Sequence, residues 1–375
     1  MMEIGSIYEI DPRVIELAGK KTNSFLRLNE IDKYQRENTV FTASGREAIA
    51  LSLISMEKEY PAITKKCILP AYMCDTVFIP FEQNGWELFF YHINENLEAD
   101  LEELQQLTKN IKPGLLFIHD YYGVDTWKPM RSFLRTCKET GTLIMRDMTQ
   151  SYYLQSHDTF TDYIIGSLRK WYPVPDGGFV TTNHTIDMGA VIKDDYFSTE
   201  RSSCLTNKWR YLYRQDNLED KVLIKQNYLT QNRQLEDWLD HINHVSSISG
   251  ISVSILQGIV EEDYKKKRNE NYNILYLGLK DMNCLSYPFK EHNKDIVPLY
   301  FPIYTENRES LQSFLRKHDI YAPVLWPIGK ENEKILDEQE KFIYSSLLAL
   351  PMDARYGEAE MLKIIDTIKQ FDQLV

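Results

Sequence analysis

The chain has 375 residues, of which 43% are hydrophobic, and its 43 basic and 55 acidic side chains give a net charge of −12 at pH 7. This length and hydrophobic content are sufficient for a large core and two domains. The acidic balance argues against non-specific binding to nucleic acid or to an anionic membrane surface.

The five cysteines are odd in number, and no pair of them has metal-ligand spacing. The first residues, MMEIGSIYEIDPR, contain no apolar signal core, and no run approaches the ~18 apolar residues of a membrane span. We therefore expect a reduced, cytoplasmic protein without a metal site and without a membrane partner.

From about residue 40 onward, apolar runs of strand length alternate with helical patterns. Ser44 is a candidate cap at the start of the first helix. The predicted strands cover 66–72, 86–93, 114–123, 142–147, 162–168 and 177–183, and the predicted helices cover 42–60, 100–109 and 127–141. Residues 200–290 are helical and polar in pattern, with a helix over 261–272. Strands over 296–305, 320–328 and 346–352 and helices over 307–319 and 358–371 complete the chain.

Strands separated by helices predict an α/β fold with a mostly parallel sheet covered by helices on both faces. The C-terminal pattern predicts a smaller α+β domain. We place the large domain at residues 1–255, with an N-terminal arm over 1–40, and the small domain at 256–375. In parallel sheets, ligands bind beyond the carboxyl ends of the strands, so residues at those ends are candidates for a site.

The segment Met145–Phe179 holds an ordered set of such candidates. It contains an acid, Asp147, then Gln150, then the pattern Ser-x-x-Lys formed by Ser167 and Lys170. Pyridoxal 5′-phosphate needs an amine for its aldehyde, a carboxylate for its ring nitrogen, and hydroxyl and free backbone N–H groups for its phosphate. The sequence therefore predicts this cofactor.

Lys170 is the candidate for the covalent bond to the cofactor aldehyde. Such a lysine must be partly deprotonated, so its pKa has to fall below the free value of about 10.4. Lys170 lies among apolar residues and next to a second cation, Arg169, and both features favour the neutral amine. The alternative is a surface lysine on a hairpin, which the order of the other groups argues against.

Asp147 is expected to face the pyridine nitrogen of the cofactor, because a carboxylate there keeps the ring protonated. A strand-end acid that caps a turn is the alternative. Gln150 is expected to bond the ring hydroxyl, or else to be an ordinary loop amide. His119, at the end of a buried strand, is a core histidine in the simpler interpretation and an acid–base group in the other.

The cofactor phosphate needs hydrogen-bond donors. Ser44, Gly45 and Arg46 open a helix and offer a hydroxyl, backbone N–H groups and the positive end of the helix dipole. Ser167 adds a second hydroxyl. Tyr72, just past a strand end, either stacks on the cofactor ring or packs as a core residue.

These motifs resemble those of the DegT/DnrJ/StrS family of pyridoxal-phosphate aminotransferases, which have the aspartate aminotransferase-like, type I fold. The likeness extends from TASGREAIALSL through the acid-x-x-Gln motif DMTQ and SLRKWYPVPDGG to LALPMDARYGEAEM. Three features depart from the family pattern. Cys74 stands where the family often has a stacking aromatic residue, and no Asn-Tyr-Arg-Met stretch occurs between Tyr211 and Leu256. The loop HDYYG is one residue longer than the HxxG-type loop that is usual in the family.

The resemblance implies transfer of an amino group, typically from glutamate, to a keto-sugar carried on a nucleotide, for surface polysaccharides or related amino sugars. It implies that Lys170 bonds the cofactor and carries the proton. It also implies a homodimer with shared active sites. The alternatives are a dehydratase or lyase with the same cofactor, and a cofactor-binding regulator without turnover. Dehydratase relatives of the family tend to have histidine at the position of Lys170. The lysine in this chain therefore favours the aminotransferase function.

Overall fold

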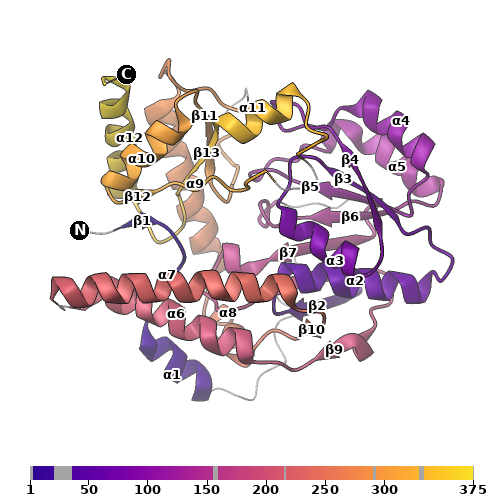
Figure 1. Ribbon diagram of the computed structural model, residues 1–375, viewed down its shortest axis with the longest axis horizontal. Helices are drawn as coiled ribbons and strands as arrows, with labels where there is room; N and C mark the ends of the chain where they lie inside the picture. The colour runs from indigo at the N-terminus through magenta and orange to yellow at the C-terminus, as the bar shows by residue number, and fades with distance from the viewer. Residues whose placement is uncertain are drawn as a thin grey trace.

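The computed structural model describes residues 3–20, 36–154, 159–214, 217–289, 293–328 and 333–374. Its largest element is a seven-stranded sheet in the order β2-β8-β7-β6-β5-β3-β4. Figure 1 shows this sheet in one half of the molecule and the C-terminal helices in the other. The strands are β2 (Asn38–Thr42), β3 (Lys66–Pro70), β4 (Glu87–Tyr91), β5 (Leu115–His119), β6 (Leu143–Asp147), β7 (Tyr163–Ser167) and β8 (Gly178–Thr182).

Two apolar layers cover the sheet because successive side chains of a strand point to opposite faces. Ile68, Leu116 and Ile144 belong to one core cluster, together with residues of α4 (Leu101–Ile111) and α5 (Arg131–Glu139). Their neighbours Cys67, Leu69, Leu115 and Met145 belong to another cluster, with α2 (Gly45–Glu59) and α3 (Phe78–Gln83). The predicted sheet with helices on both faces is confirmed.

The strand directions decide where the ends of the strands meet. The neighbouring strands from β7 to β4 are parallel to one another, while β8 is antiparallel to both β7 and β2. Six strands, β2 included, therefore run in one direction and only β8 runs against them. Lys170 lies in the connection between the antiparallel strands β7 and β8. The edge strand β2 was not predicted from the sequence pattern.

The C-terminal part is a smaller α+β unit, as predicted. Its apolar cluster joins α9, α10 and α12 to the antiparallel pair β11–β13. The N-terminal strand β1 (Ile4–Gly5) pairs in parallel with β12 (Ile320–Tyr321). The other elements here are α9 (Glu261–Leu279), β11 (Phe301–Tyr304), α10 (Arg308–Lys317), α11 (Glu338–Ser346), β13 (Leu347–Leu350) and α12 (Glu358–Asp372).

One predicted strand is mostly wrong. The apolar run 320–328 forms only the two-residue β12, because the two prolines of this run, Pro323 and Pro327, cannot donate to a ladder. The N-terminal arm lies partly outside the described residues, and the domain boundary at 255/256 stays a prediction.

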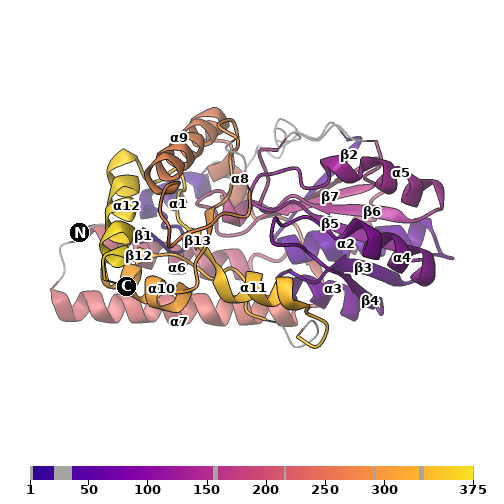
Figure 2. The same ribbon diagram turned by 90° about the horizontal axis from the view of Figure 1, so that it is seen from above.

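Two long helices, α6 (Tyr196–Tyr213) and α7 (Leu218–His241), follow the strands of the large sheet along the chain and precede the C-terminal part. They fall in the region that the sequence pattern predicted to be helical and polar. They lie side by side in both views, and α7 ends near α2 (Figures 1 and 2). The remaining short elements are α1 (Pro12–Lys20), β9 (Val191–Ile192), β10 (Val245–Ser246) and α8 (Gly250–Leu256). Within the described ranges, no helix has the length and hydrophobicity that a membrane span requires.

Candidate active site

The predicted site residues meet at one edge of the large sheet. Because the six co-directional strands end at the same edge, the residues that close or follow them are neighbours in space. Asp147 closes β6 and Ser167 closes β7, while Ser44 follows β2 and Tyr72 follows β3. Lys170 lies three residues beyond the end of β7, in the short 3₁₀ turn Leu168–Lys170.

The start of α2 lies against the end of β7. Ser44 is the N-cap of α2, and its Oγ accepts a hydrogen bond from the Glu47 backbone N–H at 3.2 Å. A Cβ built on Gly45 would lie 3.5 Å from the Ser167 Cβ, so the two segments touch. The first N–H groups of α2 have no partners within the helix, and such groups bind anions. The structure thus brings together Ser44, Gly45 and Ser167 as expected for a phosphate site.

Gly178 is what permits this close approach. A Cβ at this position would lie only 2.2 Å from the Ser44 backbone oxygen and 2.6 Å from the Gly45 nitrogen. The first strand residue of β8 therefore has to be glycine for the hairpin to lie against the start of α2. The sequence pattern does not reveal this contact of Gly178 with Ser44.

Asp147 is buried, and both of its carboxylate oxygens have partners. Oδ2 lies 3.0 Å from Nδ1 of His119, and Oδ1 accepts from the Thr149 backbone N–H at 2.8 Å. His119 lies at the end of the neighbouring strand β5 and packs edge-on against Tyr121. Its other ring nitrogen, Nε2, is buried and has no hydrogen-bond partner in the part of the chain that the structure describes. His119 is therefore a buried residue that holds the carboxylate of Asp147 in place.

Gln150 and Tyr72 both make contacts within the protein. The Gln150 Oε1 atom accepts from the Tyr122 backbone N–H at 3.1 Å, which ties the loop after β6 to the loop after β5. The Tyr72 ring is 3% exposed and lies among the rings of Tyr121, Trp326 and Tyr344, at centroid distances of 5.7, 4.8 and 4.9 Å. Trp326 and Tyr344 belong to the C-terminal part, so Tyr72 also joins the two halves of the molecule.

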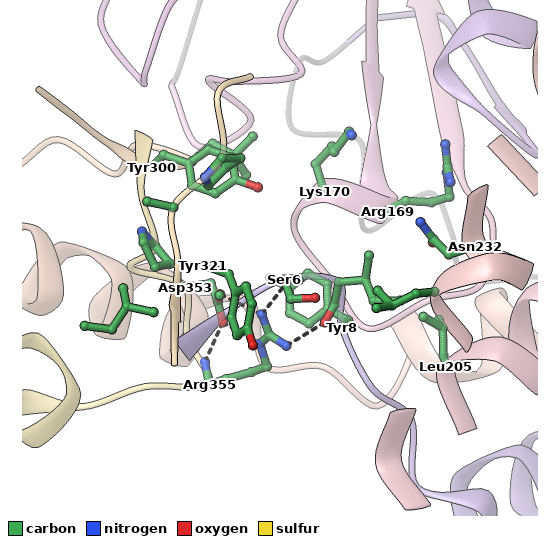
Figure 3. Close-up of a pocket in the computed structure, with 18 of the residues that line it drawn as sticks. Ser6, Tyr8, Arg169, Lys170, Leu205, Asn232, Tyr300, Tyr321, Asp353 and Arg355 are labelled. Atoms are coloured by element: carbon green, nitrogen blue, oxygen red, sulfur yellow. Dashed lines mark hydrogen bonds and ion pairs between the residues drawn. The ribbon is translucent and has the colours of Figure 1, made fainter. Parts of the chain in front are cut away.

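Lys170 opens into a cavity of about 430 Å³ between the large sheet, α6, α7 and the C-terminal part. Figure 3 shows Lys170, Arg169 and Asn232 along one wall of this cavity and Tyr321 and Arg355 along the other. The side chain of Lys170 is exposed to solvent in this cavity. Partial desolvation by the surrounding protein lowers the pKa of its amine, and the positive charges of Arg169 and Arg46 act in the same direction. Glu236 opposes the shift.

Of the predicted site residues, Lys170 alone lines the cavity. The others do not: Ser44, Gly45, Arg46, Tyr72, Asp147, Gln150 and Ser167. Cys74 lies near Lys170: burial raises the pKa of its thiol, while the positive charge of Lys170 lowers it. The fourth residue of the expected phosphate set, Arg46, extends toward α7, with its Nη2 3.1 Å from the Asp240 carboxylate.

Several solved structures with a similar fold are named as aminotransferases. A DegT DnrJ EryC1 StrS aminotransferase from Brucella abortus is 17% identical, with a TM-score of 0.65 over 96% of this chain and 94% of its own. A sugar aminotransferase from Micromonospora echinospora is 13% identical, with a TM-score of 0.68 over 99% and 100%. An aminotransferase of pseudoaminic acid biosynthesis from Helicobacter pylori is 16% identical, with a TM-score of 0.66 over both full chains.

The chain has the type I fold of these aminotransferases. No protein-family model matches the sequence, and no curated protein matches it. At these identities the likeness establishes the fold, and the roles of individual residues have to be argued from the site itself.

Helix α7 contributes to the site near Lys170 side chains that the sequence pattern did not predict. Glu236 Oε1 accepts from Arg169 Nη1 at 2.9 Å and from Arg201 Nη1 at 3.0 Å. Burial alone would raise the pKa of the Glu236 carboxyl, but Arg169 and Arg201 hold it well below its usual range. The only sequence signal for this contribution is the four-residue spacing of Asn232, Glu236 and Asp240, which places them on one helix face.

Proposed function

We propose that the protein is a pyridoxal-phosphate-dependent aminotransferase of the DegT/DnrJ/StrS family. The function rests chiefly on Lys170, an amine with a lowered pKa at the carboxyl edge of a type I sheet. The Ser44-Gly45 helix start and Ser167 lie together at the same edge. The names of several structural neighbours, which are sugar aminotransferases, support the reaction class.

The residues at the edge match the chemistry of the cofactor. Lys170 would bond the aldehyde, and Asp147, held by His119, would lie against the ring nitrogen. Backbone N–H groups at the start of α2 and the Ser167 hydroxyl would bind the phosphate. When bound, pyridoxal phosphate supplies an aldehyde that condenses with amines and a ring that accepts electrons.

The chain's own residues then have defined tasks in the reaction. The Lys170 amine, once displaced by the donor, would take the proton from the donor Cα and carry it to the carbon that had been the cofactor's aldehyde carbon. A positioned proton carrier of this kind contributes about 10²–10⁴-fold in rate. Asp147 places a carboxyl group in a buried position. The contacts from His119 and Thr149 fix the orientation of that group, so little reorganisation accompanies the reaction.

We further propose glutamate as the donor and a nucleotide-linked keto-sugar as the acceptor, in amino-sugar synthesis for surface polysaccharides or related products. We place the enzyme in the cytoplasm as a homodimer with shared active sites. These finer assignments follow from the family resemblance and from the names of structural neighbours such as the aminotransferase of pseudoaminic acid biosynthesis.

Borohydride trapping tests the assignment of Lys170. The protein is supplied with excess pyridoxal phosphate, reduced, digested and mapped, and we expect the cofactor on Lys170. A Lys170→Ala variant is expected to lose both the absorbance of the bound cofactor and all turnover. An unmodified Lys170 in the wild-type protein, or a Lys170→Ala variant that still transaminates, contradicts the proposal.

A spectral titration separates the enzyme from its alternatives. A yellow solution that bleaches on addition of glutamate indicates an active aminotransferase. A yellow solution that does not change with any amino donor indicates a cofactor-binding regulator. A panel of nucleotide-linked keto-sugars then identifies the acceptor.

A further inference from the structure

Several cations gather around the end of α7. Three guanidinium groups, those of Arg46, Arg169 and Arg201, form what we call the arginine cluster. Within ion-pair distance they share two carboxylates: Arg46 meets both Glu236 and Asp240, whereas Arg169 and Arg201 meet Glu236. The amine of Lys170 adds a further cation close to Glu236, and the buried carboxylate of Asp176 also acts on Arg169. Cations taken out of water need anionic partners, and here the single carboxylate of Glu236 serves three guanidinium groups at once.

The arginine cluster also has buried donors that are not used. Among the residues that the structure describes, Arg46 Nη1, Arg169 Nε and Arg201 Nε are buried and have no hydrogen-bond partner. Asp240 Oδ1, next to Arg46, is an unused acceptor in the same cluster. Arg201 is only 7% exposed. A buried donor left unpaired costs about 1–3 kcal/mol, and more when it is charged. The unused donors of Arg169 and Arg201, which have no such acceptor beside them, indicate that an acceptor-rich group binds there.

Two members of the cluster face the cavity that contains Lys170. Arg169 and Arg201 both line it, and Asn232 of α7 lines it beside them. Figure 3 shows Arg169 and Asn232 on the same side of the cavity as Lys170. The position of Glu236 shows what fits between the two arginines, because its Oε1 accepts from both of them at 2.9 and 3.0 Å. A carboxylate matches the donor geometry of guanidinium groups.

We propose that Arg169 and Arg201 form a binding subsite for a carboxylate of the amino donor, and that Glu236 is an internal carboxylate that competes for it. The inference rests on the proposed aminotransferase function, since it assigns the donor as a dicarboxylate. A ligand carboxylate takes the place of Glu236 on the two arginines and meets the donors that Glu236 leaves unused. The subsite adjoins Lys170, so the other end of the donor reaches the reacting amine.

The competition makes an unusual prediction about Glu236. Glu236→Gln keeps the shape of the side chain but removes its charge, so a ligand carboxylate no longer displaces an anion. We expect this variant to bind glutarate about tenfold more tightly than the wild type. Arg201→Gln is expected to bind glutarate at least about tenfold more weakly, since it loses a charge-assisted hydrogen bond. Asp237→Asn is the matched control, because it removes a negative charge from an exposed position next to Glu236 on the same helix. We expect its affinity for glutarate to equal that of the wild type.

The measurement is isothermal titration of the cofactor-supplied protein with glutarate and, separately, with inorganic phosphate. Glutarate binding that persists with the cofactor present supports a carboxylate subsite. Binding of either anion that disappears on cofactor loading assigns the cluster to the cofactor phosphate and overturns the proposal. Unchanged affinity in both Glu236→Gln and Arg201→Gln also overturns it.

Two checks keep the outcome interpretable. Thermal unfolding of each variant establishes that it is folded, and if Arg201→Gln does not fold, Arg201→Lys replaces it. Arg201→Lys keeps the positive charge but loses the planar guanidinium group, which can donate two parallel hydrogen bonds to a carboxylate. Weaker glutarate binding is again expected. If the protein takes up no cofactor, the proposed function fails, whereas the glutarate titration of the same variants still decides the subsite.

Discussion

Gly178→Ala perturbs the contact that sets the geometry of the proposed phosphate site. The added Cβ would lie 2.2 Å from the Ser44 backbone oxygen, whereas ordinary contacts begin at 3.4 Å. The neighbouring atoms belong to the backbone, so no side chain can rotate away. Either β8 or the start of α2 must therefore move by about 1 Å, because packed interiors contain few voids that absorb such a shift.

The expected effect has two parts. Overpacking of this kind destabilises by about 1–3 kcal/mol, so thermal unfolding should show a Tm lowered by a few degrees. The displaced N–H groups of α2 should also bind the cofactor phosphate more weakly, which an absorbance titration with pyridoxal phosphate measures. Gly250→Ala is the matched control, since its Cβ would meet no atom within 4 Å. A Gly178→Ala protein with wild-type Tm and cofactor affinity would refute the reasoning.

Two further predictions concern buried acids at the same edge. Asp147→Asn should retain some cofactor but turn over more slowly, because the ring nitrogen loses its carboxylate; unchanged kcat would contradict the role of Asp147. Burial raises the pKa of Glu47, in the first turn of α2, from 4.5 to about 7. The folded state then binds a proton more tightly than the unfolded state, so this contribution to stability is present below pH 4.5 and is lost as pH rises through about 7. Urea unfolding should therefore show Glu47→Gln to be more stable than the wild type at pH 8, by at most about 3 kcal/mol, and the advantage should shrink toward pH 5. An advantage that does not depend on pH would show that Glu47 does not titrate in this range.

The sequence by itself determined the elements and their order. Local periodicity and caps depend on residues a few positions apart, and such patterns can be read without knowledge of the fold. Ser44 caps α2 as predicted, and the strands that end at Asp147 and Ser167 form as predicted. The order of these residues along the chain also led to the proposed cofactor and to the type I fold that the solved structures share, because chemistry of this kind requires particular residue types at strand ends.

Only the tertiary structure decided which distant groups surround Lys170. Glu236 lies 67 positions after Arg169, and its effect on the site comes from the packing of α7 across the end of the sheet. Two other contacts also join residues that are far apart in the sequence. Strand β1 pairs with β12, and Trp326 of the C-terminal part contacts Tyr72. Such contacts leave no local pattern, because helix amphipathicity shows which face is polar but not which charges that face will meet.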